Sequence, residues 1–235
     1  MPVRALIFDV FGTLVDWRTG VARQVSAAFA EKGIAVDASR FATHWRAEYD
    51  PGMAPIREGL RGYTPLDELH RENLERVLTA EGHAARFTAE EVTALARAWE
   101  ALPPWPEVPE ALARLRAGYL VAPCSNGSIA LMARLARFAG FGWDAILGAE
   151  IARDYKPNLA VYRASAAALR LPPGEVMMVA AHNNDLAAAR EAGLATAFFP
   201  RPEEHGPGQT TDLTPDAPWD IVATDLSDLA DRLGA

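Results

Sequence analysis

The sequence predicts an α/β fold built on a parallel sheet, with a helical segment inserted after the first strand. From about residue 105 onward, short apolar runs alternate with helical patterns. This order is typical of a parallel sheet whose strands are joined by crossover helices. By contrast, residues 17–98 carry helical patterns and no convincing strand. We therefore expect one core formed by residues 1–16 and 99–235, with residues 17–98 as the insert.

Six apolar runs are expected to form the strands: residues 3–8, 119–124, 145–147, 176–181, 195–199 and 221–223. Helical patterns lie between the later runs, at residues 110–117, 128–138, 160–171 and 186–194. Gly193 marks the end of the last of these helices, since glycine is favoured just after a helix. In the insert, Thr88 and Glu91 have the spacing of a capping box and should begin its last helix. The proline-rich stretch from Pro103 should form a stiff return to the sheet.

Composition limits the kinds of partner that the protein can have. The chain has 235 residues, 31 acidic and 23 basic, and a formal charge of −8. That charge argues against binding to nucleic acid or to an anionic membrane, and an anionic substrate would need local cations. The single cysteine, Cys124, cannot form an internal disulfide or a thiolate metal cluster, and its apolar setting predicts a buried packing residue. With no apolar stretch of membrane-spanning length and no signal-peptide pattern, we expect a cytoplasmic protein.

Polar side chains follow four of the predicted strands or their loops. Ligands collect at the carboxyl ends of strands in open α/β sheets, so these groups should meet at one site. Any one of these side chains alone could simply hydrogen-bond to the backbone of its own loop. This also holds for Asp9 in the stretch IFDVFGTLVD, which could merely cap the turn that follows it. The combination favours a functional site made of Asp9 and Thr13, Ser125 and Asn126, Lys156, and the segment from His182 to Asp185.

These residues resemble the four motifs of the haloacid dehalogenase superfamily. Asp9 stands in a D-x-x-G-T motif, and the other three motifs are matched by the stretch SNG from Ser125, by Lys156 with its following proline, and by Asp185. The motifs occur in the family's order, and the resemblance covers essentially the whole chain. It implies a Rossmann-like parallel-sheet core, the fold of this superfamily, and it implies that residues 17–98 form the helical cap domain.

Two positions separate the phosphatase and dehalogenase branches of this superfamily. Phosphatase members carry a second aspartate two positions after the nucleophile, where this chain has Phe11. A phenyl ring cannot donate a proton to a leaving oxygen. The fourth motif, HNND, offers only Asp185, which is a poor donor set for magnesium. The sequence instead resembles the metal-independent (S)-2-haloacid dehalogenases, with Tyr162 after the lysine motif and Arg46 after a tryptophan in the insert.

The resemblance implies hydrolysis of a carbon–halogen bond beside a carboxylate, without metal or cofactor. Asp9 would displace the halide with inversion and form an ester, which water would then hydrolyse to a 2-hydroxy acid. Lys156 would keep Asp9 ionised, with Tyr162 orienting the lysine, and Thr13 would fix the Asp9 rotamer. The substrate carboxylate would be held by Ser125 and by the backbone N–H groups of Val10 and Phe11. The departing halide would be bound by Arg46 and Asn126. The hydrolytic water would be positioned by His182 and Asp185.

Several points stay open at this stage. His182 stands where many members have asparagine, so it is either a base or only a hydrogen-bond donor. Asn184 takes a position that is often aromatic, which leaves the substrate open among chloroacetate, 2-chloropropionate and fluoroacetate. Taken alone, Arg46 would be interpreted as part of a solvated helix face, and only the other motifs favour a place at the site. A phosphatase and a non-catalytic acid-binding protein remain the alternative functions, and the resemblance suggests a homodimer.

Overall fold

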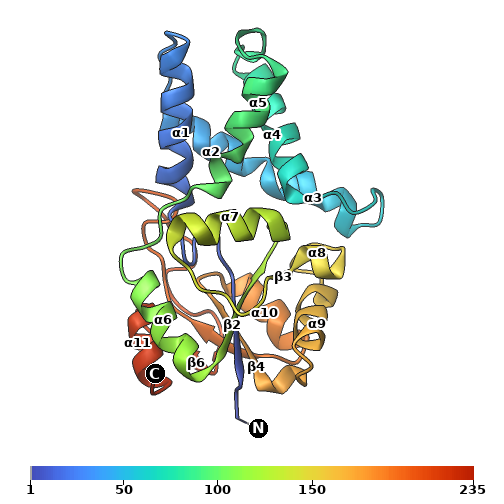
Figure 1. Ribbon diagram of the computed structural model, residues 1–235, viewed down its shortest axis with the longest axis vertical. Helices are drawn as coiled ribbons and strands as arrows, with labels where there is room; N and C mark the ends of the chain where they lie inside the picture. Colours follow the sequence, from blue (N-terminus) through green and yellow to red (C-terminus); the bar gives the residue numbers. More distant parts are fainter. Residues whose placement is uncertain (1) are drawn as a thin grey trace.

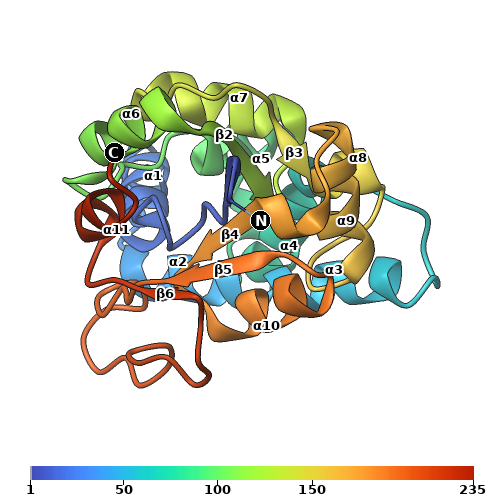
Figure 2. The ribbon, with the colours of Figure 1, turned by 90° about the horizontal axis from the view of Figure 1, so that it is seen from below.

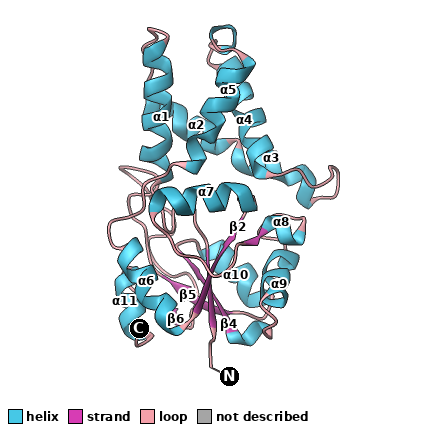
Figure 3. Ribbon diagram, viewed as in Figure 1, coloured by secondary structure: helices cyan, strands magenta, loops and turns pink. Residues whose placement is uncertain are grey.

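The computed structural model describes residues 2–235, and its lower half is built on a six-stranded parallel sheet (Figure 3). The strand order is β3-β2-β1-β4-β5-β6, with β1 near the centre. The strands are β1 (Ala5–Phe8), β2 (Leu120–Ser125), β3 (Leu147–Gly148), β4 (Val176–Ala180), β5 (Ala195–Phe198) and β6 (Ile221–Val222). Each of the six apolar runs overlaps one of these strands, so the predicted α/β fold with a parallel sheet is confirmed.

The central strand is buried on both of its faces, which explains its unbroken apolar sequence. Side chains alternate along a strand, so Leu6 and Phe8 point to one face while Ala5 and Ile7 point to the other. The first face packs against α6 (Val108–Gly118), α7 (Ile129–Ala139) and α11 (Leu226–Arg232). The second face packs against α9 (Leu159–Ala168) and α10 (Asn183–Glu191). Figure 2 shows these helices on the two sides of the sheet.

Four core helices, α6, α7, α9 and α10, lie where the sequence predicts helices. Two further helices of the core were not predicted from the sequence. The additional helices are α8 (Ala149–Ala152) and α11. With four and seven residues, each is too short to show a clear helical period. The start of α11 is stabilised by an N-cap: the Asp225 side chain accepts a hydrogen bond from the N–H of Asp228.

The segment after the first strand forms a group of helices beyond the carboxyl ends of the strands (Figure 1). They are α1 (Trp17–Glu31), α2 (Ala38–Ala47), α3 (Tyr49–Arg57), α4 (Leu66–Ala80), α5 (Ala89–Ala96) and the 3₁₀ turns Ala84–Arg86 and Arg97–Glu100. Side chains cap the starts of three: Asp16 for α1, Asp37 for α2 and Thr88 for α5. The capping box formed by Thr88 and Glu91 is present as predicted.

The chain leaves the sheet and returns to it through two neighbouring segments, residues 14–16 and 103–105, which we call the neck. The N–H of Asp16 donates to the carbonyl of Pro103 at 2.9 Å, and the N–H of Trp105 donates to the carbonyl of Leu14 at 3.1 Å. The two ends of the helical segment are thus tied together beside β1. This pairing fixes the helices above the end of the strand that carries Asp9.

The helical segment also packs directly on the turn after β1. The ring of Phe11 meets the rings of Tyr49, His70 and Trp99 edge-on, with centroids 6.4, 6.3 and 5.6 Å away. Buried apolar side chains from these helices, from β1 and from α7 belong to one continuous cluster. None of the helices in residues 2–235 combines the length and the apolar character needed to cross a membrane.

Candidate active site

Asp9 follows β1 directly and is held in place by the neighbouring strand. Its N–H donates to the carbonyl of Val179 in β4 at 3.0 Å. Thr13 lies one turn further on, where its hydroxyl donates to Asp9 Oδ2 at 2.7 Å and accepts the N–H of Ala181 at 3.0 Å. One hydroxyl therefore connects the Asp9 carboxylate to the residue that follows β4, which restricts the rotation of the Asp9 side chain.

Lys156 lies between two buried carboxylates. Its Nζ is 2.9 Å from Asp9 Oδ1 and 2.5 Å from Asp185 Oδ2. The hydroxyl of Tyr162 donates to the other oxygen of Asp185, so both Asp185 oxygens are engaged. We expected Tyr162 to orient Lys156. In the structure Tyr162 holds Asp185, which in turn holds the lysine.

The charges at this site determine which groups stay ionised. Burial alone would raise the pKa of the Asp9 carboxyl, but Lys156 and His182 more than offset this and hold that pKa well below its usual range. Burial would likewise lower the pKa of Lys156, yet Asp185 and Asp9 raise it above its usual value. For Asp185, burial is the largest effect and raises its pKa, with Lys156 opposing. Asp9 is therefore an ionised carboxylate in a buried setting.

His182 connects Asp9 to a glutamate that the sequence did not suggest. Its Nδ1 is 3.1 Å from Asp9 Oδ2, and its Nε2 is 2.8 Å from Glu204 Oε2. Glu204 is 2% exposed, and Trp17 Nε1 donates to its other oxygen at 3.1 Å. Burial would lower the pKa of His182, but Glu204 and Asp9 raise it well above 6.5. The imidazole is thus a cation held between two carboxylates.

Glu204 reaches the site because Gly12 leaves room for it. Gly12 has φ +86°, and a Cβ placed there would lie 2.1 Å from Glu204 Oε1. Glu204 lies in the loop after β5, whose sequence carries only turn signals. In the sequence, the one hint of this contact is the glycine of the D-x-x-G-T motif. A glycine there suggests that another group packs closely against the backbone, but it does not say which group.

On the helical side of the site, Arg46 lies over the ring of Tyr49. The guanidinium carbon of Arg46 is 3.8 Å from the Tyr49 centroid and 5.6 Å from the Trp17 centroid. Arg46 Nη1 is buried and has no hydrogen-bond partner within residues 2–235. Cation–π contacts hold the guanidinium while leaving its N–H groups available to an anion. Tyr49 is a second residue that the sequence did not indicate.

These groups surround one cavity of about 450 Å³. Of the residues that we predicted for the site, it is lined by Asp9, Phe11, Arg46, Asn126, Lys156, His182, Asn184 and Asp185. The lining also includes Tyr49, Glu204 and His205, with Asp212, Ala47, Asp50, Met53 and Pro157 completing it.

Four predicted residues do not line the cavity: Val10, Thr13, Ser125 and Tyr162. Thr13 and Tyr162 act on Asp9 and Asp185 as described above. Ser125 is fully buried, and its hydroxyl oxygen accepts the N–H of Gly127 at 3.1 Å, so direct contact with a substrate carboxylate stays a prediction. The N–H groups of Val10 and Phe11 have no protein acceptor within residues 2–235. Asn184 is exposed at the rim.

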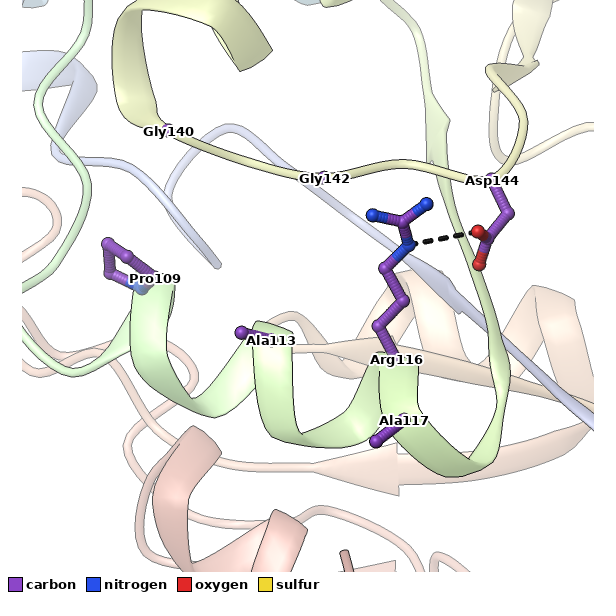
Figure 4. A pocket seen from close by; sticks show the side chains of 7 residues that line it. All are labelled: Pro109, Ala113, Arg116, Ala117, Gly140, Gly142 and Asp144. Atoms are coloured by element: carbon purple, nitrogen blue, oxygen red, sulfur yellow. Dashed lines mark hydrogen bonds and ion pairs between the residues drawn. The ribbon is translucent and has the colours of Figure 1, made fainter.

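Two further features, a surface hollow and the single cysteine, lack the reactive side chains found at the Asp9 cavity. A hollow between α6 and the loop after α7 holds the ion pair of Arg116 and Asp144 and is otherwise lined by proline, alanine and glycine (Figure 4). Cys124 is buried as predicted, and burial raises the pKa of its thiol to about 11, which makes it a poor nucleophile. No group of three or more His, Cys, Asp or Glu side chains is placed to hold a metal ion in residues 2–235.

Comparison with known proteins places this chain in a family. Residues 3–193 match the family model of haloacid dehalogenase-like hydrolases. A crystal structure of a defluorinating L-2-haloacid dehalogenase is 50% identical, with a TM-score of 0.97 over 99% of this chain and 96% of that one. An (S)-2-haloacid dehalogenase of Pseudomonas putida is 26% identical over 85% of this chain and 87% of its own length. A phosphoglycolate phosphatase of Cereibacter sphaeroides is 28% identical over 86% and 87%.

Proposed function

The chain belongs to the haloacid dehalogenase-like hydrolase family, and we propose that it hydrolyses the carbon–halogen bond of short 2-haloalkanoic acids. The observation that carries this proposal is the buried, ionised Asp9 carboxylate facing a cavity whose other side holds Arg46. A buried carboxylate is a better nucleophile than a hydrated one. Arg46 supplies positive charge across the cavity, where a halide leaves.

In the first step, an oxygen of Asp9 attacks the carbon that bears the halogen. A carbon–oxygen bond forms, the carbon–halogen bond breaks, and the halide leaves with the electron pair and with inversion at carbon. Arg46 and the Asn126 amide receive the developing negative charge. The substrate carboxylate is held by the N–H groups of Val10 and Phe11, with Ser125 beside them. Thr13 and Lys156 hold the Asp9 oxygens at a fixed angle of attack.

In the second step, water attacks the carbonyl carbon of the Asp9 ester. The bond between that carbon and the product oxygen then breaks, the product oxygen takes a proton to give the 2-hydroxy acid, and Asp9 returns as a carboxylate. Ester formation removes the negative charge of Asp9, which is one of the two charges that raise the pKa of His182. The imidazolium therefore becomes more acidic when the ester forms. With Glu204 on its far nitrogen, His182 can pass a proton to that carboxylate and take one from water. This assigns His182 the role of base. Lys156 and Asp185 remain beside the ester.

The alternative function, a phosphatase, does not fit these residues. Its reaction needs an acid two positions after the nucleophile and carboxylate oxygens free for magnesium. Phe11 is instead enclosed by aromatic rings. Both oxygens of Asp185 are bonded, to Lys156 and to Tyr162, and both oxygens of Asp9 have partners too. With these four oxygens bonded to cations and hydroxyls, Asp9 and Asp185 are a poor donor pair for Mg²⁺.

The proposal extends to organisation and location. We assign residues 17–98 to a cap domain, with 1–16 and 99–235 forming the core. We further assign the enzyme to the cytoplasm, in keeping with its one unpaired cysteine, and propose a homodimer without metal or cofactor. Sedimentation of the purified protein tests the oligomeric state.

The experiment that tests the function follows the oxygen that enters the product. A single turnover is run in heavy-oxygen water with enzyme in excess over 2-chloropropionate. Attack by Asp9 gives a product hydroxyl that carries an unlabelled enzyme oxygen, and the heavy isotope enters the Asp9 carboxylate. Heavy oxygen in the product with none in Asp9 would mean direct attack by water, and absence of halide release would reject the dehalogenase function.

A further inference from the structure

Tyr49 is positioned between the two groups assigned to the halide, although no motif includes it. It lines the cavity, and its ring lies under the Arg46 guanidinium at 3.8 Å. Its position is fixed by contacts on other sides, with Phe11 edge-on at 6.4 Å and His70 at 6.1 Å. The ring is therefore held in place, and the hydroxyl is the one polar atom that this side chain can offer to the cavity it lines.

The hydrogen bonds of Asn126 determine what that hydroxyl can do. The carbonyl oxygen of Asn126 accepts the backbone N–H of Lys156 at 2.8 Å. Burial raises the pKa of Tyr49, while Arg46, Lys156 and Asn126 oppose the rise. With its carbonyl oxygen engaged by Lys156, Asn126 has its NH₂ end left for the cavity that Tyr49 also lines. The phenolic hydrogen is then left to donate elsewhere.

We propose that the Tyr49 hydroxyl donates a hydrogen bond to the departing halide, together with Arg46 and Asn126, and that this third donor makes 2-fluoro acids substrates. The inference rests on the proposed function. As Asp9 attacks, the carbon–fluorine bond breaks and fluoride leaves with the electron pair, while the phenol keeps its proton. Fluoride is the smallest halide and concentrates its charge most, so it gains most from an O–H donor placed where that charge develops.

The fluorinated and chlorinated acids respond differently to loss of this donor. Bromide and chloride are larger and leave readily, so the cation of Arg46 and the amide of Asn126 suffice for them. Removing one hydrogen bond to an anion lowers a rate by about tenfold to a hundredfold when the bond strengthens in the transition state. We expect that loss for fluoride alone.

The test is the variant Tyr49→Phe, which keeps the ring beneath Arg46 and removes the hydroxyl. Halide release is measured for fluoroacetate, chloroacetate and bromoacetate. We expect kcat/KM for fluoroacetate to fall about tenfold to a hundredfold relative to chloroacetate, with a smaller loss for bromoacetate. An unchanged thermal unfolding midpoint shows that the variant is folded.

The matched control is Tyr63→Phe. Tyr63 also belongs to the helical segment, and its buried hydroxyl has no partner within residues 2–235, but it does not line the cavity. We expect its fluoride-to-chloride ratio to equal that of the wild type.

Three results would overturn the assignment. An equal loss for all three acids would mean that Tyr49 contacts the shared carboxylate, and an unchanged ratio would mean that it contacts no halide. Wild-type enzyme that releases chloride but no fluoride would reject the substrate class. Wild-type enzyme that releases no halide from any acid would reject the proposed function itself, which is a different result.

Discussion

Three of the carboxylates that line the cavity lie beside three cations. Asp9, Asp185 and Glu204 lie with Lys156, His182 and Arg46. These cations offset the negative charge of the three carboxylates, which favours binding of an anionic substrate. When Asp9 becomes an ester, its charge leaves with the halide. The balance then shifts toward the cations, which favours release of a proton by His182.

Glu204→Gln should separate the two chemical steps. The amide keeps the shape of the side chain but cannot take a proton from His182, so we expect kcat to fall about 10²- to 10⁴-fold. Attack by Asp9 does not need this proton, so one halide per enzyme should still appear in a fast burst. Rapid-quench measurement of halide release checks this. The control is Glu203→Gln, an exposed neighbour in the same loop, and an unchanged kcat in Glu204→Gln would contradict the role.

The raised pKa of His182 makes a pH-dependent contribution to stability. Below about pH 6.5 the unfolded chain also holds the proton, so the full contribution of the imidazolium is present. It is lost as the pH rises through the higher pKa of the folded state. His182→Asn should lower the free energy of unfolding by about 3 kcal/mol at pH 6, and the difference from the wild type should shrink at alkaline pH. Urea unfolding between pH 6 and pH 10 measures it; a constant difference would refute the assignment of charge.

The turn after β1 is the element on which the site depends most. It carries the nucleophile, Phe11 and Thr13, and its glycine leaves the space that Glu204 fills. The turn therefore positions the groups for both chemical steps within five residues. Arg201 supports it from the other side, since its Nε donates to the carbonyl of Thr13 at 2.8 Å.

Gly12→Ala should impair the second step more than the first. The added Cβ would displace Glu204, and the positive φ adds about 1–2 kcal/mol of backbone strain. We expect slow turnover with the initial halide burst retained. Gly33→Ala is the matched control, because Gly33 has φ +65° and nothing within 4 Å of the added Cβ. It should lose only the unfolding free energy that the backbone strain costs, measured by denaturant titration, with unchanged turnover. Equal turnover in the two variants would disprove the steric argument.

Elements and site residues differ in how far local sequence predicts them. The strands follow from short apolar runs, and Asp9, Lys156 and Asp185 follow from their places at strand ends and in motifs. Glu204 and Tyr49 could not be predicted in this way. Glu204 contacts His182 and Gly12 from an irregular loop, and Tyr49 is one apolar position among many in a helix. Their roles arise from contacts between segments that are distant in the sequence, and the periodicity of apolar residues within one segment cannot predict such contacts.

At the scale of the whole molecule, the occupied carboxylates predict that turnover needs no metal. Lys156 and Tyr162 take the oxygens that a divalent ion would use. Halide release from chloroacetate should be unchanged after incubation with a strong chelator. The control is hydrolysis of nitrophenyl phosphate, which should be negligible with or without magnesium. Loss of halide release on chelation, with recovery on adding magnesium, would contradict the metal-independent mechanism.

The neck has a consequence for how such enzymes diversify. Because residues 14–16 and 103–105 are hydrogen-bonded neighbours, the whole helical segment begins and ends at one point on the core. An insertion whose ends meet can be lengthened, shortened or exchanged while the strand order stays the same. The segment contributes Arg46 and Tyr49, whereas the core contributes Asp9 and Lys156. A single recombination event that exchanges the helical segment at the neck would therefore change the residues proposed to contact the leaving group, while the core residues Asp9 and Lys156 stay the same.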